Sequence, residues 1–308
     1  MELFKILLPY ILAGISVGGQ YALISIGYTM VYGILRLINF AHGDVFMAAG
    51  LIMVYLAQAL PLYYAVPAVV IIIAAAGFVI ERVAYKPLRS APRMSVMISA
   101  IGVSYFIQNF ALYITGGLTK NYPQIPWISD SVTLLGVTTR RVTAVTPFLT
   151  AALIVALILL VNHTKMGMAM RAVAKDFETS QLMGIKIDSV ISATFAIGSL
   201  LAAVGSMLYF SNYPGVFPTA GAMSGLKAFV AAVFGGIGSI PGAVLGGIII
   251  GLSESIIKGL DTVLVQTGVY SSPLELATFS DAFTFVLLIV ILVFKPTGLF
   301  GEKTADKV

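Results

Sequence analysis

Four polar side chains that could take part in chemistry lie close together near the N-terminus, within the segment RLINFAHGD. They are Arg36, Asn39, His42 and Asp44. An imidazole two residues from a carboxylate could exchange protons or contribute to a metal site. One histidine and one aspartate provide too few ligands for a metal ion, and no second polar cluster converges on them. An enzyme built on His42 and Asp44 is therefore a weak hypothesis.

The sequence contains no other familiar catalytic arrangement. The chain has two histidines, His42 and His163, and no cysteine, and it lacks a serine triad, paired catalytic carboxylates and an HExxH motif. The glycine-rich run GGIGSIPGAVLGG at 235–247 lacks the Lys-Ser/Thr ending of a phosphate-binding loop. We therefore expect no enzyme activity, no metal and no cofactor, and the chain alone could not bind and hydrolyse ATP.

The composition is that of an integral membrane protein. Of its 308 residues, 59% are hydrophobic and only 10% are charged, whereas soluble domains carry about 25% charged residues. Segments such as 66–80 are continuously apolar, which excludes the alternating pattern of a transmembrane barrel. The net charge of +5 comes from basic residues in the connections between apolar segments, so it does not indicate nucleic-acid binding.

The apolar segments predict an all-α, polytopic bundle that forms a single permease-like domain over residues 1–308. A helix needs about 20 apolar residues to cross a bilayer. The segment nearest the N-terminus and the seventh one are too long and too rich in glycine for one simple span, which predicts broken or re-entrant helices. The segments, roughly eight in number, are 6–35, 41–60, 63–80, 94–115, 142–162, 190–211, 226–259 and 276–294.

Two basic connections give the orientation. Residues 81–93 and 163–189 each contain four lysines or arginines, and the excess of positive charge places both in the cytoplasm. Residues 116–141 then lie outside. A short similarity between AHGDVFMAAG at 41–50 and IPGAVLGGII at 240–249 suggests two structural repeats that flank the middle spans.

In this membrane context, two sets of residues are candidates for a translocation pathway or a helix break. Asn39, His42, Gly43 and Asp44 either line a pathway at a discontinuous helix, with Gly43 permitting the break, or form a solvated turn in which Asp44 caps the next helix. The second set is Gly238, Pro241 and Gly242. There the proline would break or start a helix, and the spacing of Gly238, Gly242 and Gly246 favours close helix packing.

Charged residues also interrupt the apolar segments near the C-terminus. Glu254 and Lys258 are spaced i, i+4 in the favourable order, which predicts a mutually neutralising pair on one helix. Asp281 lies inside the last apolar segment without an obvious partner. It either caps a helix at the interface or faces the interior of the bundle.

The polar segment 163–189 predicts a short amphipathic helix. Met170, Val173, Ala174 and Phe177 fall at i, i+3, i+4 and i+7 and form one apolar stripe. Gly184 is a candidate C-terminal cap. A lipid-bound helix would carry a strongly basic face and large apolar anchors. Acidic residues are mixed with the basic ones here, and most apolar side chains are small, so docking to a protein is favoured.

The charged residues of this helix, Arg171, Lys175, Asp176 and Glu178, leave the contact face undecided. Either the apolar stripe meets a partner, or the stripe packs against the chain's own helices and the charged residues meet the partner.

Several motifs together resemble a known family. Glu178-Thr179-Ser180, followed after three residues by Gly184, resembles the EAA-xxx-G loop of ABC importer permeases, with two small residues in place of alanines. LINFAHGDVFMAAG, ISAIGVSYFIQN, MGMAMRAVAKD and GGIGSIPGAVLGG are similar to branched-chain amino-acid ABC importer permeases of the LivH type. The resemblance extends from about Gly19 to the KPTGLFG segment at 295–301. It is weakest in 116–141.

The resemblance implies a multisubunit importer in the bacterial inner membrane. Its expected partners are a second, related permease, two cytoplasmic ATP-binding subunits and an extracytoplasmic protein that delivers leucine, isoleucine or valine. Residues 163–189 would then contain the coupling helix that docks on one ATPase. Permeases of the same family that carry urea, amides or other amino acids are an alternative. A less favoured alternative is an ion-coupled secondary transporter that uses Asp44 or Glu254 as a proton site.

Overall fold

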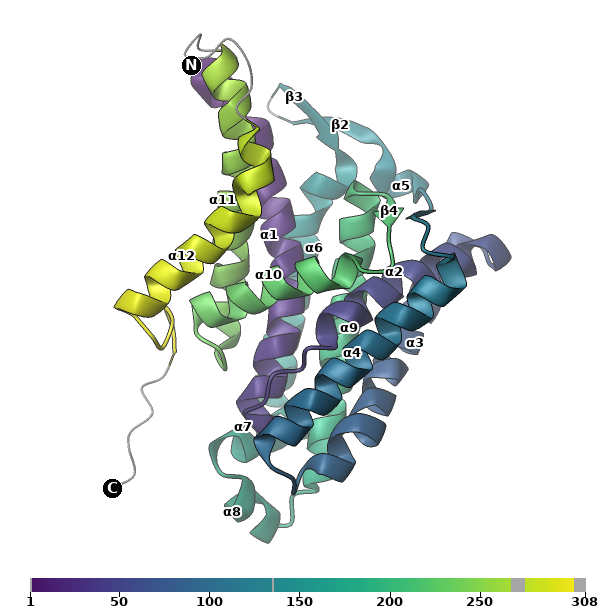
Figure 1. The fold of residues 1–308 in the computed structure, drawn as a ribbon, viewed down its shortest axis with the longest axis vertical. Helices are drawn as coiled ribbons and strands as arrows, with labels where there is room; N and C mark the ends of the chain where they lie inside the picture. The colour runs from purple at the N-terminus through teal and green to yellow at the C-terminus, as the bar shows by residue number, and fades with distance from the viewer. Residues whose placement is uncertain (1, 135, 267–274, 302–308) are drawn as a thin grey trace.

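The computed structural model describes residues 2–134, 136–266 and 275–301, and most of these are helical (Figure 1). The helical elements, in chain order, are α1 (Glu2–Leu35), α2 (His42–Ala59), α3 (Leu62–Ile80), the π-helical turn η1 (Glu81–Tyr85), the 3-10 turn η2 (Lys86–Leu88), α4 (Arg93–Thr115), α5 (Pro126–Ser129), α6 (Arg141–His163), α7 (Lys165–Lys175), α8 (Phe177–Leu182), α9 (Ile187–Asn212), α10 (Ala220–Gly235), α11 (Ile240–Gln266), the 3-10 turn η3 (Leu276–Phe279) and α12 (Ser280–Phe294). Four short strands form two antiparallel pairs, β1 (Lys120–Asn121) with β4 (Gly215–Val216) and β2 (Ser131–Leu134) with β3 (Val137–Arg140).

The expected number of spans is confirmed. Within the described residues, eight helical stretches are long and apolar enough to cross a membrane. The expected break in 226–259 is also confirmed, because α10 ends at Gly235 and α11 begins at Ile240. With 16 residues, α10 is shorter than the length needed to cross a bilayer, and it lies across the bundle (Figure 1).

The expectation of a broken first segment was wrong. Helix α1 is continuous over 34 residues, even though Pro9 lies inside it. Its glycines do not interrupt the helix but permit close packing. A Cβ added at Gly18 would lie 2.7 Å from Cα of Ile248 in α11, and one at Gly14 would lie 2.9 Å from Cα of Leu252. Small residues let helix backbones approach in this way.

The glycines of α11 serve two neighbours. Gly247 and Gly251 lie against α1, whereas Gly242 and Gly246 lie against Gly235 and the Ala231 backbone of α10. The four-residue spacing noted in the sequence therefore does reflect helix packing at 242 and 246. Gly238 does not belong to that seam, since it lies in the connection before α11 with φ +102°.

Replacing Gly251 with leucine is expected to lower the free energy of unfolding by about 1–3 kcal/mol, because a side chain at this position has no space against the α1 backbone. A matched control is Gly102→Leu, since a Cβ at Gly102 meets no atom within 4 Å. Thermal unfolding of the two purified variants checks this. Equal stability of Gly251→Leu and Gly102→Leu would contradict the packing argument.

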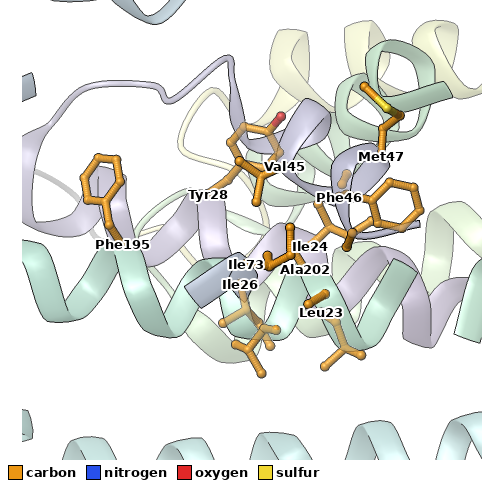
Figure 2. Packing of buried hydrophobic residues seen from close by; sticks show 14 of the residues in the cluster. Leu23, Ile24, Ile26, Tyr28, Val45, Phe46, Met47, Ile73, Phe195 and Ala202 are labelled. Atoms are coloured by element: carbon orange, nitrogen blue, oxygen red, sulfur yellow. The ribbon is translucent and has the colours of Figure 1, made fainter. Parts of the chain in front are cut away.

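The centre of the bundle is formed by α1, α2 and α9, which are largely buried, whereas α4, α6 and α12 expose most of their apolar side chains. Figure 2 shows part of this centre, where Leu23, Ile24 and Phe46 lie close to Ala202. All four are fully buried. The outer helices are therefore the ones whose apolar surface remains for lipid or for another subunit.

The two ends of the bundle differ in character. Residues 81–93 and helices α7 and α8 lie at one end, which we call the basic end, and α5 with the β2–β3 hairpin lies at the other (Figure 1). The segments that the charge pattern assigned to one side of a membrane thus share one end of the structure. The unbroken helix α1 runs the length of the bundle: it starts near the β2–β3 hairpin and finishes at the basic end (Figure 1).

The segment after α12 closes the break between α10 and α11. The Leu299 N–H donates to the carbonyl of Phe234 at 3.0 Å, and the Phe300 N–H donates to the carbonyl of Gly235 at 2.8 Å. Both carbonyls belong to the last turn of α10, where a helix leaves such groups without internal partners. Gly236 has φ +104° and lies against the Gly301 backbone. The last described residues therefore form the C-terminal cap of α10.

Candidate functional site

The break between α1 and α2 covers residues 36–41. Arg36 has φ +54°, and the Asn39 side chain accepts hydrogen bonds from the Ala41 N–H at 3.1 Å and from the Tyr85 hydroxyl at 2.8 Å. Gly43 does not permit this break as expected, because it lies inside the first turn of α2. Its missing side chain instead lets α10 approach, since a Cβ there would lie 2.7 Å from Cα of Gly225.

Asp44 is held in a polar cluster beside a cavity. Its carboxylate accepts hydrogen bonds from the Ser104 hydroxyl at 2.5 Å and the Gln108 amide at 3.0 Å, both on α4. The Asp44 residue is only 2% exposed. The adjacent cavity has a volume of 310 Å³ and lies between α1, α2, α4 and α10. Its lining residues are Tyr28, Phe40, Asp44, Ile101, Ser104, Tyr105, Gln108, Gly221, Ala222, Gly225, Leu226 and Phe229.

His42 does not share this environment. It is buried, its ring meets the Tyr28 ring edge-on at 4.9 Å between centroids, and it occupies the space that a side chain on Gly27 would need. Asn39, His42 and Asp44, which the sequence placed in one group, therefore have different roles. Asp44 lines the cavity, whereas Asn39 accepts a hydrogen bond from Tyr85. Ser104 and Gln108 were missed, although two polar residues at i, i+4 in an apolar segment are a usable signal.

The second predicted break lies elsewhere. The Ser239 hydroxyl accepts a hydrogen bond from the Gly242 N–H at 3.2 Å, and Pro241 occupies the first turn of α11. Gly238 lines a smaller cavity of 120 Å³ together with Met170 and Ala174. The break at 236–239 is thus next to the segment 163–189 and not next to Asp44.

An ionic cluster around the buried side chains of Glu254 and Lys227 joins α1, α10, α11 and α12. Glu254 accepts from Lys258 at 2.5 Å, from the Tyr21 hydroxyl at 2.9 Å, and pairs with Lys227 at 3.1 Å. Lys227 also pairs with Asp281 at 2.6 Å. The predicted Glu254–Lys258 pair is therefore present. Asp281, which had no obvious partner in the sequence, pairs with Lys227.

The segment 163–189 forms two helices, so the single amphipathic helix was a wrong expectation. Asp176 separates α7 from α8, and its carboxylate accepts from the Thr179 N–H at 3.0 Å as the N-cap of α8. Thr164 caps α7 in the same way, accepting from the Gly167 N–H at 3.0 Å. Gly184 ends α8 with φ +83°, and the Ile185 N–H donates to the Ser180 carbonyl at 3.1 Å, which is a Schellman-type C-terminal cap.

The apolar stripe of α7 packs against the chain's own helices. Met170 and Val173 are buried, and Ala174 is half-buried. Phe177 belongs to the next helix; it is 40% exposed and borders a cavity lined by Ile34, Leu35, Leu37, Tyr85, Arg89 and Val96. Outward-facing residues of the two helices include four charged ones and two large apolar ones: Arg171, Lys175, Asp176, Glu178, Leu182 and Met183.

An ionic network connects this segment to the bundle. Glu81, which is fully buried in the π-helical turn η1, pairs with Arg89 and accepts from the Ser192 hydroxyl of α9 at 2.5 Å. Arg89 also bonds Asp188 at 2.5 Å, and Lys86 pairs with Asp188 at 2.6 Å. Asp188 lies in the first turn of α9, four residues after Gly184. The network therefore ties α3 and α9 together directly beside α8.

Nothing in this arrangement resembles a metal centre. Over residues 2–134, 136–266 and 275–301, no three His, Asp or Glu side chains come together in a way that could hold a metal ion.

Comparison with known proteins agrees with the membrane architecture. The model of a family described as branched-chain amino acid transport system / permease component matches residues 10–292. The chain is 38% identical to the high-affinity branched-chain amino acid transport system permease protein LivH of Salmonella typhimurium, over 100% of this chain and 99% of that protein. It is 38% identical to BraD of Pseudomonas aeruginosa, over 98% of each chain. With the eight spans, these matches support a multi-pass inner-membrane protein, and the chain belongs to the family of permease components of branched-chain amino acid transport systems.

Proposed function

We propose that this protein is the permease subunit of an ABC importer for branched-chain amino acids. In this proposal it forms the translocation pathway with a second, related permease, and two cytoplasmic ATP-binding subunits and an extracytoplasmic binding protein complete the system. The similarity to LivH and BraD over the whole chain supports the substrate class. ATP hydrolysis would take place in the partner subunits, because the sequence lacks a nucleotide-binding loop.

The exposed tip of α8 is the observation that carries the proposed ATPase contact. Leu182 and Met183 are 87% and 78% exposed at the basic end, whereas the α7 stripe is already buried against the bundle. Large apolar side chains rimmed by charged ones are typical of protein interaction sites. We therefore assign the docking face to α8 and the charged residues of α7, with Phe177 at its edge.

The caps and the ionic network supply a mechanism of coupling. Both short helices are capped, so each would keep its shape when an ATPase pulls on the tip of α8. The motion would reach α3 and α9 through the Glu81–Arg89–Asp188 network and would reorganise the bundle as a rigid-body transition. Repetition of this cycle would expose the pathway to the two sides of the membrane in turn.

Specificity in this scheme need not come from tight binding inside the permease, since the extracytoplasmic protein can select the amino acid. The permease only has to pass a small solute that bears one ammonium and one carboxylate. An ion-coupled transporter that uses Glu254 is less well supported, because two lysines already engage this carboxylate.

Replacing Leu182 with aspartate is expected to reduce ATP-driven uptake at least about tenfold, because burying this side chain at an interface is worth roughly 1.5–3 kcal/mol. Leu118→Asp is the control, since Leu118 is 66% exposed between α4 and β1, far from α8. Uptake is measured in vesicles that contain the assembled complex, and immunoblotting confirms equal amounts of permease. Unchanged uptake and unchanged binding of the ATPase would contradict the docking assignment.

The test of the function as a whole is reconstitution. The chain is co-purified with its candidate partner subunits and placed in vesicles with the binding protein. Leucine, isoleucine and valine uptake is then measured with and without ATP, and urea, a short amide and a non-branched amino acid serve as competing cargo. If ATP drove the uptake of only one of the competing solutes, that solute would be the cargo in place of the branched-chain amino acids. Uptake by this chain alone, driven by an ion gradient, would overturn the importer assignment.

A further inference from the structure

We propose that Asp44 binds the ammonium group of the transported amino acid within the cavity between α2, α4 and α10. This inference rests on the proposed function for the identity of the ligand, and it adds a subsite and a recognition chemistry. The site is the carboxylate of Asp44 with Ser104 and Gln108, and the ligand class is a small primary amine with an apolar side chain.

The charge of Asp44 is not neutralised by the protein. The carboxylate is buried, and among the described residues no lysine, arginine or histidine pairs with it; its two hydrogen-bond donors, Ser104 and Gln108, are neutral. A carboxylate can accept about four hydrogen bonds, so two acceptor positions remain. A buried charge is stable when it is paired, and a ligand ammonium entering the cavity would supply both the opposite charge and the missing donors.

The shape of the cavity suits the rest of such a ligand. Its volume of 310 Å³ is at the small end of the range for ligand pockets, about 300–1,000 Å³. Apolar side chains of α4 and α10, including Ile101, Leu226 and Phe229, form much of the wall, while the carboxylate, hydroxyl and amide of the Asp44 cluster lie together. Apart from the Asp44 cluster and the two lining tyrosines, Tyr28 and Tyr105, the wall is apolar. This matches a branched aliphatic amine better than it matches a sugar or an inorganic cation.

Three glycines bring the carboxylate to this wall. Gly43 of α2 meets Gly221 and Gly225 of α10 so closely that a Cβ on any of them would collide with backbone. The first turn of α2, which carries Asp44, therefore lies directly against the first half of α10. Glycine is therefore required at position 43 for the close contact between α2 and α10, and not for a helix break.

The cavity is reachable from outside the subunit. Three of its lining residues, Ile101, Tyr105 and Leu226, are 40%, 60% and 43% exposed. They lie on α4 and α10, which lie on the same face of the bundle (Figure 1). If amino acids pass between two permeases, this face is the one on which Asp44 would meet them.

Cysteine labelling tests the subsite directly, because the chain contains no cysteine. Ser104→Cys is introduced into the full-length chain within the assembled complex in vesicles. It is treated with cationic aminoethyl methanethiosulfonate or with anionic sulfonatoethyl methanethiosulfonate. The control is Leu118→Cys, because Leu118 is 66% exposed and lies away from both α8 and the cavity. Relative to the rates at this control, we expect the cationic reagent to label Ser104→Cys about tenfold faster than the anionic one, because opposite charges lie a few ångströms apart in a partly enclosed site. Adding Asp44→Asn should remove this preference.

Protection by unlabelled compounds gives a second readout that keeps Asp44 intact. Leucine and isopentylamine, which carry the ammonium, should slow labelling of Ser104→Cys, whereas isocaproate, which lacks it, should not. Equal rates for the two reagents, no labelling by either, or equal protection by isocaproate would each overturn the proposal. The two proposals can fail separately. If Ser104→Cys showed charge-selective labelling but the unsubstituted complex showed no ATP-driven leucine uptake, the ammonium site would be supported and the proposed importer function would be contradicted.

Discussion

Replacing Arg89 with methionine is expected to lower the free energy of unfolding by about 3–5 kcal/mol, the cost of leaving a buried charge without its partner. Glu81 has no exposed surface, and Arg89 is its cationic partner in the described structure; only the Ser192 hydroxyl would remain. Methionine keeps the unbranched apolar part of the side chain and lacks the guanidinium group, so most of the loss would come from the missing charge and hydrogen bonds. The quantity to measure is the thermal unfolding of purified permease.

Two further variants separate charge from packing at this site. Lys86→Met removes an ion pair whose side chains are 38% and 47% exposed, and it should cost less than about 1 kcal/mol. Adding Glu81→Gln to Arg89→Met removes the unpaired charge and should recover much of the lost stability. If the double variant were as unstable as Arg89→Met, the buried charge would not be the cause. Uptake should also fall in Arg89→Met, since the network joins the end of α3 to the first turn of α9, which follows α8 in the chain.

Replacing Glu254 with leucine is expected to cost about 3 kcal/mol or more, because three donors lose their shared acceptor at once. Tyr21 and Lys227 are buried, and both bond this carboxylate. Lys227 would keep Asp281, whose side chain is 38% exposed. Because Lys227 pairs with Glu254 of α11 and Asp281 of α12, we also expect α10 to become more accessible to hydrogen exchange.

The comparison for Glu254 is Lys258→Met on the same helix. Lys258 is 40% exposed and its loss leaves the Glu254–Lys227 pair in place, so a cost below about 1 kcal/mol is expected. Amide exchange measured by mass spectrometry reports on α10 in both variants. A Glu254→Leu protein with the stability and α10 protection of Lys258→Met would show that the cluster contributes little.

The spans and the break before α11 were predictable because each depends on local sequence. Runs of apolar residues give the spans directly, and glycines around Pro241 give the break. The continuity of α1 was not predictable in this way. A glycine can serve a positive φ, as at Gly236, or a close helix contact, as at Gly18, and the sequence around it does not distinguish the two uses.

The site was only partly predictable for a related reason. Asp44 stands out as a charge in an apolar region, but its donors Ser104 and Gln108 come from a helix far along the chain, and so does the Lys227 partner of Asp281. The division of α7 from α8 was missed although the signal was local: Asp176 followed by Thr179 is an N-cap pattern, and the apolar spacing that includes Phe177 concealed it.

The closure of α10 by the segment after α12 has a consequence for how the chain is made. The carbonyls of Phe234 and Gly235 find their partners in Leu299 and Phe300, which leave the ribosome after every spanning helix. Until then, these two carbonyls lack the donors that they have in the complete structure, and a helix end needs such partners for its last carbonyls. During synthesis, the C-terminal cap of α10 can therefore be completed only after α12 and the residues that follow it have been made.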